Sequence, residues 1–103
     1  MTAVRELAAG RAGDKGSTLD LTLVAHDDAS YAVLCEAITA ERAEALLAPV
    51  APSSVARFEL PRLRALKYIA PEALDGGLYA SLHAGMHWQK AAIWLLLDAE
   101  VAP

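Results

Sequence analysis

The stretch Gly10-Arg11-Ala12-Gly13-Asp14-Lys15-Gly16-Ser17-Thr18 combines three glycines, charges of both signs and two hydroxyl groups. Glycine tolerates positive φ angles and allows another group to approach the backbone closely. The segments on both sides have the pattern of strands, and a hairpin turn between strands needs only about two to five residues. The stretch is therefore expected to be a ligand-binding loop between two strands. A solvated, glycine-rich connector is the alternative.

The loop carries side chains suited to proton transfer and to anion binding. Asp14 can move a proton, and Lys15 can stabilise developing oxyanion charge. His26, at the end of the following strand beside two aspartates, is the third catalytic candidate; an ordinary surface histidine is the alternative. The predicted ligand-binding residues each supply a cation, a backbone N–H group or a hydroxyl, and they are Arg11, Gly13, Gly16, Ser17 and Thr18.

The loop does not have the spacing of a nucleotide-binding P-loop. That motif places lysine directly before a Ser or Thr that opens a helix, whereas Gly16 follows Lys15 here. The next residues, 19–24, alternate between apolar and polar as a strand does. No helix N-terminus is then available for a phosphate. A backbone nest for a carboxylate or a thioester oxygen stays open.

Chain length, composition and net charge limit the classes of function that this protein can have. A chain of 103 residues is expected to form one domain, 1–103, with a single core. A net charge of −4 argues against nucleic acid, and the 55% hydrophobic content suggests a buried subunit interface, most simply in a homo-oligomer. One cysteine, no leader-like segment and no apolar run long enough for a membrane indicate a cytoplasmic protein. No motif for a cofactor is recognised.

Periodicity predicts the remaining elements. Strands are expected at 4–9, 18–26, 55–60 and 63–69, and a helix at 88–99, for which a strand at 93–97 is the alternative. A helical segment begins after Asp27-Asp28 and ends at Pro49, either continuous or broken near Thr39. One helical turn is expected at 71–74, and 78–83 suits either a strand or a short helix. This order predicts an α+β fold: a mostly antiparallel sheet with helices packed on one face.

Three further groups contain side chains that could form a site. His83 and His87 have the spacing of two metal ligands on a helix, but no third ligand stands at a recognisable spacing, so no metal is predicted. Cys35 lies in an apolar helical stripe and is expected to act as a small hydrophobe. The basic cluster Arg62, Arg64 and Lys67, in which Arg62 and Arg64 would share a strand face, either steers an acidic ligand or solvates an edge strand.

Several stretches together resemble one known family. They are Arg11-Ala12-Gly13-Asp14-Lys15-Gly16, Leu21-Thr22-Leu23-Val24-Ala25, Arg57-Phe58-Glu59-Leu60-Pro61, Leu63-Arg64-Ala65-Leu66, Leu74-Asp75-Gly76-Gly77 and Leu95-Leu96-Leu97-Asp98-Ala99-Glu100-Val101. In this order and spacing they resemble the AtuA-like ferredoxin-fold domain. The chain departs from that family at 17–20 and, more strongly, at 84–89.

The resemblance implies a ferredoxin-like α+β fold and a role in acyl-CoA or related carboxylate metabolism. Members of the family accompany a larger domain or partner chain in proteins tied to acyclic terpene utilisation. The expected function is a small enzyme or enzyme subunit of hydratase, dehydratase or isomerase type. Its ligand would be a carboxylate or an acyl thioester, bound at Gly13-Asp14-Lys15-Gly16. The alternative is a non-catalytic module that pairs with a larger AtuA-like partner or with itself.

Overall fold

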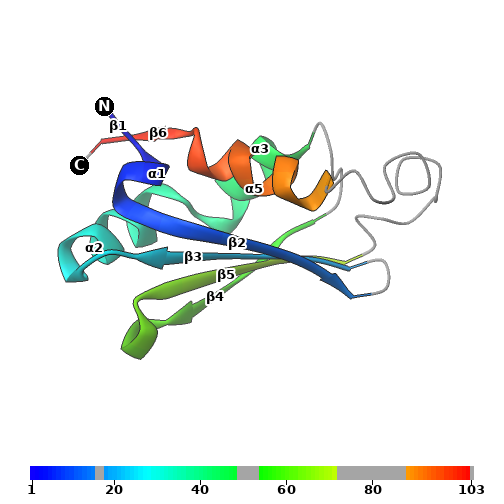
Figure 1. Ribbon diagram of the computed structural model, residues 1–103, viewed down its shortest axis with the longest axis horizontal. Helices are drawn as coiled ribbons and strands as arrows, with labels where there is room; N and C mark the ends of the chain where they lie inside the picture. The colour runs from blue at the N-terminus through cyan, green and yellow to red at the C-terminus, as the bar shows by residue number, and fades with distance from the viewer. Residues whose placement is uncertain (16–17, 49–53, 72–87, 103) are drawn as a thin grey trace.

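The computed structural model describes residues 1–15, 18–48, 54–71 and 88–102, without the side chains of 14, 15 and 88–91. These residues form a four-stranded antiparallel sheet, in the order β2-β3-β5-β4, and the helices lie on one of its faces (Figure 1). A separate ladder pairs β1 (Thr2–Ala3) with β6 (Glu100–Val101), which brings the two ends of the chain side by side. The expected α+β architecture is confirmed.

The central strand β3 (Thr18–Ala25) separates the two faces of the sheet. Its residues alternate without exception between partly exposed and buried, and Leu19, Leu21 and Leu23 are fully buried. This alternation was predicted, because neighbouring residues of a strand point to opposite faces. β3 pairs with β2 (Ala8–Lys15) on one side and with β5 (Ala65–Ala70) on the other. The leucines therefore form the base of the core beneath the helices.

The glycine-rich stretch is a strand rather than the long loop that the sequence predicts. β2 continues to Lys15, which pairs with Thr18, so only residues 16 and 17 separate the two strands. Continuous pairing with β3 overrides the weak strand preference of Gly and Asp. The strand predicted at 4–9 is also wrong in its first part, because Val4–Leu7 forms the short helix α1. Its first turn is tied by a hydrogen bond from the Ala3 N–H to the Glu6 carboxylate.

The segment between β3 and β4 forms two helices, α2 (Asp28–Ala37) and α3 (Ala40–Leu47). The break at Thr39 is the alternative that the sequence allowed, and its hydroxyl caps α3 by accepting the Arg42 N–H at 3.1 Å. β4 (Ala56–Leu60) then enters the sheet beyond β5 and runs parallel to β3. This arrangement, in which a third strand lies between two strands joined by helices, is a split βαβ unit.

A tight connection joins β4 to β5, as predicted from Pro61. It consists of the 3-10 helix η1 (Pro61–Leu63) followed by Arg64, which has a left-handed backbone with a φ of 51°. The Arg64 carbonyl accepts the Ala25 N–H at 2.8 Å and so fixes the turn against the end of β3. Arg62 and Arg64 therefore do not share a strand face, and that prediction is wrong because β5 begins only at Ala65.

Helix α5 (Trp88–Leu97) lies along β2 (Figure 1). The predicted helix is confirmed, and the alternative of a strand at 93–97 is wrong. The closest approach is at Gly10, where a Cβ atom would lie 2.7 Å from Ile93 Cγ1 and 3.0 Å from Leu97 Cδ1. A side chain at this position would force Ile93 or Leu97 to shift. Apart from Pro71, the predicted turn at 71–74 and the segment 78–83 lie outside the described residues.

Replacing Gly10 by alanine is expected to lower the free energy of unfolding by about 1–3 kcal/mol, because the new methyl group overpacks the contact with Ile93 and Leu97. The measurement is urea unfolding followed by tryptophan fluorescence. Gly13→Ala in the same strand is the matched control, since a Cβ there meets nothing within 4 Å, and its effect should stay within about 0.5 kcal/mol. Equal stability of the two variants would show that α5 is not seated on Gly10.

A second prediction concerns Asp27, the N-cap of α2. Its Oδ1 accepts the Ser30 N–H at 2.7 Å, and this bond holds the pKa of Asp27 below its ordinary value of 3.8. The carboxylate therefore stabilises the fold above about pH 4, and this contribution is lost as the pH falls through the lowered pKa. Asp27→Ala should lower the thermal unfolding midpoint at pH 7, and the difference from the unmutated protein should shrink toward pH 2.

Asp27→Asn provides the control for this pH dependence, because asparagine keeps a capping oxygen without a titrating group. Its midpoint should stay near that of the unmutated protein at pH 7. A difference between the alanine variant and the unmutated protein that is the same at pH 7 and pH 2 would contradict a stabilising role for the ionised cap.

Candidate functional site

The sheet face opposite the helices carries three rows of side chains, each crossing all four strands. The strand register sets their order. The first row is Arg11, Thr22, Lys67 and Phe58; the second is Gly13, Asp20, Ile69 and Ala56; the third is Ala9, Val24, Ala65 and Leu60. We call this the open face. Charged and hydroxyl groups lie on its β2 and β3 side and at Lys67, whereas β4 contributes only apolar side chains.

A groove of about 270 Å³ lies on the polar side of the open face. The residues that line it come from β2, β3 and β5, and they are Arg11, Ala12, Gly13, Asp20, Thr22 and Lys67. The space exists because Gly13 has no side chain: a Cβ atom built there would have no neighbour within 4 Å. The groove is therefore a gap in the first two rows, with cationic groups at its sides.

The two cations beside the groove differ in whether they have an ion-pair partner. Lys67 Nζ lies 3.1 Å from Asp20 Oδ2, and both side chains are about one third exposed. Arg11 is exposed and has no ion-pair partner among the residues that the structure describes. A guanidinium group with free N–H donors can bind a carboxylate through two parallel hydrogen bonds. The groove thus offers one free cation and a second that is shared with Asp20.

The structure brings together only part of the predicted site. Arg11 and Gly13 line the groove, and Thr18 lies partly exposed at the start of β3. Asp14 and Lys15 occupy consecutive positions of β2, opposite Leu19 and Thr18, and such positions belong to opposite faces of a sheet. Their side chains, and residues Gly16 and Ser17, lie outside the described part of the chain.

His26 is not near this site. It is exposed beyond the far end of β3, where its N–H donates to the Leu7 carbonyl at 2.9 Å. His26 lies four residues beyond Thr22, which pairs with Arg11, and six beyond Asp20, which pairs with Gly13. These offsets correspond to about 14 Å and about 20 Å along an extended strand. The carboxylate of the neighbouring Asp27 caps α2 instead of orienting the imidazole. Within one chain, His26 therefore does not act on a ligand bound beside Arg11 and Gly13.

Sequence reasoning missed Asp20, Thr22 and Lys67 as members of the site. One signal was available: the alternation of Leu19, Leu21 and Leu23 puts Asp20 and Thr22 together on the other face. Lys67 was recognised only as a member of the basic cluster. That it faces Thr22 depends on the register between β3 and β5, which periodicity within a single strand does not determine.

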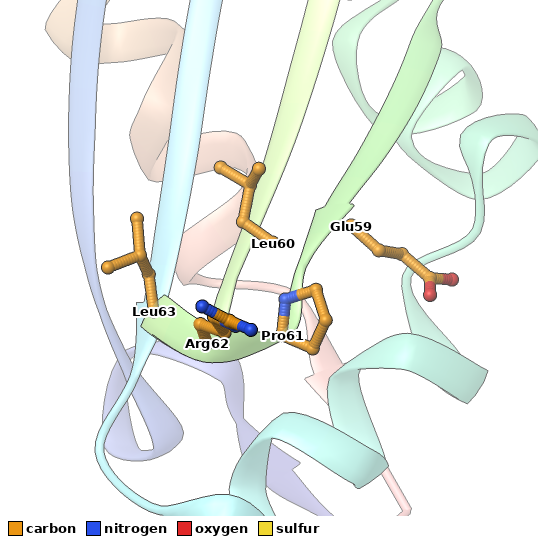
Figure 2. Close-up of a pocket in the computed structure, with 5 residues that line it drawn as sticks. All are labelled: Glu59, Leu60, Pro61, Arg62 and Leu63. Atoms are coloured by element: carbon orange, nitrogen blue, oxygen red, sulfur yellow. The ribbon is translucent and has the colours of Figure 1, made fainter.

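A second, apolar pocket of about 490 Å³ lies at the β4–β5 turn, lined by residues 59–63 (Figure 2). In Figure 2 the side chains of Leu60 and Leu63 lie on the same side of the turn, whereas Glu59 points away from them. Leu63 is 66% exposed and Leu60 37% exposed. Large apolar side chains are rarely left in contact with water in such a group without a reason, so this turn is a candidate contact surface.

A buried polar cluster lies behind the sheet, on the side of the helices. The Arg57 guanidinium donates to the Cys35 carbonyl at 2.6 Å and to the Ile38 carbonyl at 3.3 Å, and the Tyr68 hydroxyl donates to Ile38 at 2.7 Å. Burial raises the pKa of Tyr31 to about 12, and burial also raises the pKa of Tyr68. The Arg57 guanidinium and the Tyr68 hydroxyl anchor the end of α2 to the sheet.

Of the remaining candidates from the sequence, Cys35 lies in the described part of the chain and does not line the groove. Cys35 packs against the core as a partly buried residue, as predicted. His83 and His87 lie outside the described residues. Among the residues described, no three His, Cys, Asp or Glu side chains gather as metal ligands would. None of the helices in this part of the chain has the length and apolar character needed to cross a membrane.

The comparisons with known proteins identify the family. The family model described as the AtuA ferredoxin-like domain matches residues 2–102. The comparison with curated proteins and the comparison with solved structures gave no match. The match spans the sheet, the split βαβ unit and the closing ladder, so the ferredoxin-like fold expected from the resemblance is confirmed. The chain therefore belongs to the AtuA ferredoxin-like domain family.

Proposed function

We propose that this protein binds a carboxylate in the groove of the open face and serves acyl or carboxylate metabolism as a small enzyme or enzyme subunit. The observation that supports the proposal is the placement of Arg11 and Lys67 beside the gap above Gly13. Of the two expected ligands, a carboxylate suits this groove better than a thioester oxygen, because a full negative charge gains more from two cations than a neutral carbonyl does.

The chemistry proposed for the bound ligand is proton transfer next to its carbonyl group. Asp20 contributes a carboxylate at the groove, paired with Lys67. A ligand carboxylate that binds Lys67 would compete with Asp20 for the ammonium group and so release a base beside the ligand. Lys15, two residues beyond Gly13 in β2, stays proposed as the group that stabilises oxyanion charge. Asp14 belongs by alternation to the other face of the sheet, so Asp20 takes the proton-moving role that the sequence assigned to Asp14.

Binding of a small carboxylate tests this proposal. The probe is isovalerate, and its neutral amide, isovaleramide, is the reference ligand of the same shape. Arg11→Gln and Lys67→Gln should each weaken isovalerate binding by about tenfold, because each removes a charge-assisted hydrogen bond. The measurement is titration of backbone amide signals by nuclear magnetic resonance. The first signals to shift should be those of Arg11, Gly13 and Thr22.

Arg62→Gln is the matched control, since it removes one positive charge at the β4–β5 turn, away from the groove. It should leave the dissociation constant within about twofold, as expected for a screened distant charge. The proposal fails if isovalerate and isovaleramide bind equally well, or if Arg62→Gln weakens binding as much as Arg11→Gln.

A second candidate function is a non-catalytic module that pairs with itself or with a larger AtuA-like chain. The observation that favours it is the exposure of large apolar side chains on two sides of the fold: Phe58 and Leu63 near β4, and Trp94 on the outer side of α5. Their exposed fractions are 52%, 66% and 49%. Exposed aromatic residues are frequent anchors of protein interfaces.

If copies of the chain pair through one of these surfaces, sedimentation velocity should show a dimer at concentrations of tens of micromolar. Leu63→Ser or Trp94→Ser should then shift the chain to a monomer, according to which surface is buried, and leave the thermal midpoint nearly unchanged. A monomer at every concentration rules out self-pairing. Pairing with a larger chain is then tested by co-purification with the AtuA-like partner.

A further inference from the structure

The open face has an apolar half that the carboxylate groove does not use. Phe58 and Leu60 of β4 are 52% and 37% exposed, and Phe58 stands directly opposite Lys67 in the first row. Directly opposite residues of neighbouring antiparallel strands have Cβ atoms about 5 Å apart. The apolar side chain of Phe58 therefore lies next to Lys67, at the edge of the groove.

The apolar residues of β4 face away from the helices for an identifiable reason. Arg57, between Ala56 and Phe58, points to the helix side, where its guanidinium binds the Cys35 and Ile38 carbonyls. This anchoring fixes the register of β4 and commits Phe58 and Leu60 to the open face. Phe58 keeps 52% of its surface exposed, so this part of the side chain is available to a ligand.

Resting on the proposed carboxylate site, we infer that the ligand is an amphipathic carboxylate, with its anionic end between Arg11 and Lys67 and its hydrocarbon chain over β4 against Phe58. Charge complementarity sets the direction, because the cations of the first row stand on β2 and β5 and the aromatic ring stands on β4. Arg11 and Phe58 are three strand spacings apart, about 14 Å, so the face accepts an extended chain. The methylene stem of Lys67 provides apolar surface between the two ends.

A series of straight-chain carboxylates tests the inference: butanoate, hexanoate and octanoate, with octanamide as the uncharged reference. Affinity should rise by roughly twofold for each of the four added methylenes, which is about 16-fold from butanoate to octanoate, since methylenes on a half-open face lose only part of their contact with water. In amide titrations, Arg11 and Gly13 should respond to every acid. Phe58 should respond to octanoate and not to butanoate.

Two variants test separately the contacts of the hydrocarbon chain and those of the carboxylate. Phe58→Ala should remove most of the gain from butanoate to octanoate and leave butanoate binding unchanged. Arg11→Gln should weaken all three acids by a similar factor and leave the gain with chain length intact. Leu63→Ala is the matched control, because it removes an exposed apolar side chain that lies outside the three rows. Its affinities should equal those of the unmutated protein.

The outcomes distinguish the inference from the proposed function. If butanoate binds through Arg11 but octanoate binds no better, the carboxylate site stands and the inference about the chain is overturned. If no acid binds better than octanamide, the carboxylate site itself is overturned. A loss of the chain-length gain in Leu63→Ala equal to that in Phe58→Ala would show non-specific apolar adsorption and would also overturn the inference.

Discussion

The contact between α5 and Gly10 is the constraint on which the arrangement of the sheet depends. Ile93 and Leu97 occupy the space where a side chain at residue 10 would be, so the helix lies directly on β2. This close approach lets α5 cover the buried row of β3, where Leu21 and Leu23 are fully excluded from water. With α2 and α3 on the same side, the main hydrophobic cluster of the described residues lies on one face of the sheet. The residues of each strand that face the helices therefore stabilise the fold, whereas the alternate residues determine the chemistry of the open face.

The two glycines of β2 show how position gives one residue type two different uses. Gly10 is required by packing, because a helix presses against it, whereas Gly13 has empty space above it and lines the groove. The sequence presents them as equivalent members of one polar, glycine-rich run. That likeness explains why the run looked like a loop: glycine is typical of turns, and neither the helix above Gly10 nor the ladder with β3 is visible in the local pattern.

Elements with strong periodicity could be predicted, and elements defined by contacts could not. The leucine alternation of β3, the caps at Asp27 and Thr39, and the apolar helix α5 all follow from local physical chemistry. The short helix α1 was missed because its few residues are held by neighbours, including the Val4 N–H bonded to the Ala99 carbonyl at 2.9 Å. For the site, Arg11 and Gly13 were found, but Lys67 reaches the groove only through the pairing of β5 with β3.

Strand β4 shows most clearly why the nature of the open face depends on a distant contact. The alternation of the sequence correctly assigns Phe58 and Leu60 to one face of the strand and Arg57 to the other. Hydrophobicity alone, however, would bury Phe58 and Leu60 and expose Arg57. The structure has the reverse, because the Arg57 guanidinium donates to the Cys35 carbonyl at the end of α2 and to the Ile38 carbonyl, which also accepts from the Tyr68 hydroxyl. The hydrogen bonds of one partly buried arginine thus leave an aromatic ring beside a lysine on the uncovered side of the sheet. That juxtaposition of a cation with an apolar strip gives the open face its amphipathic character.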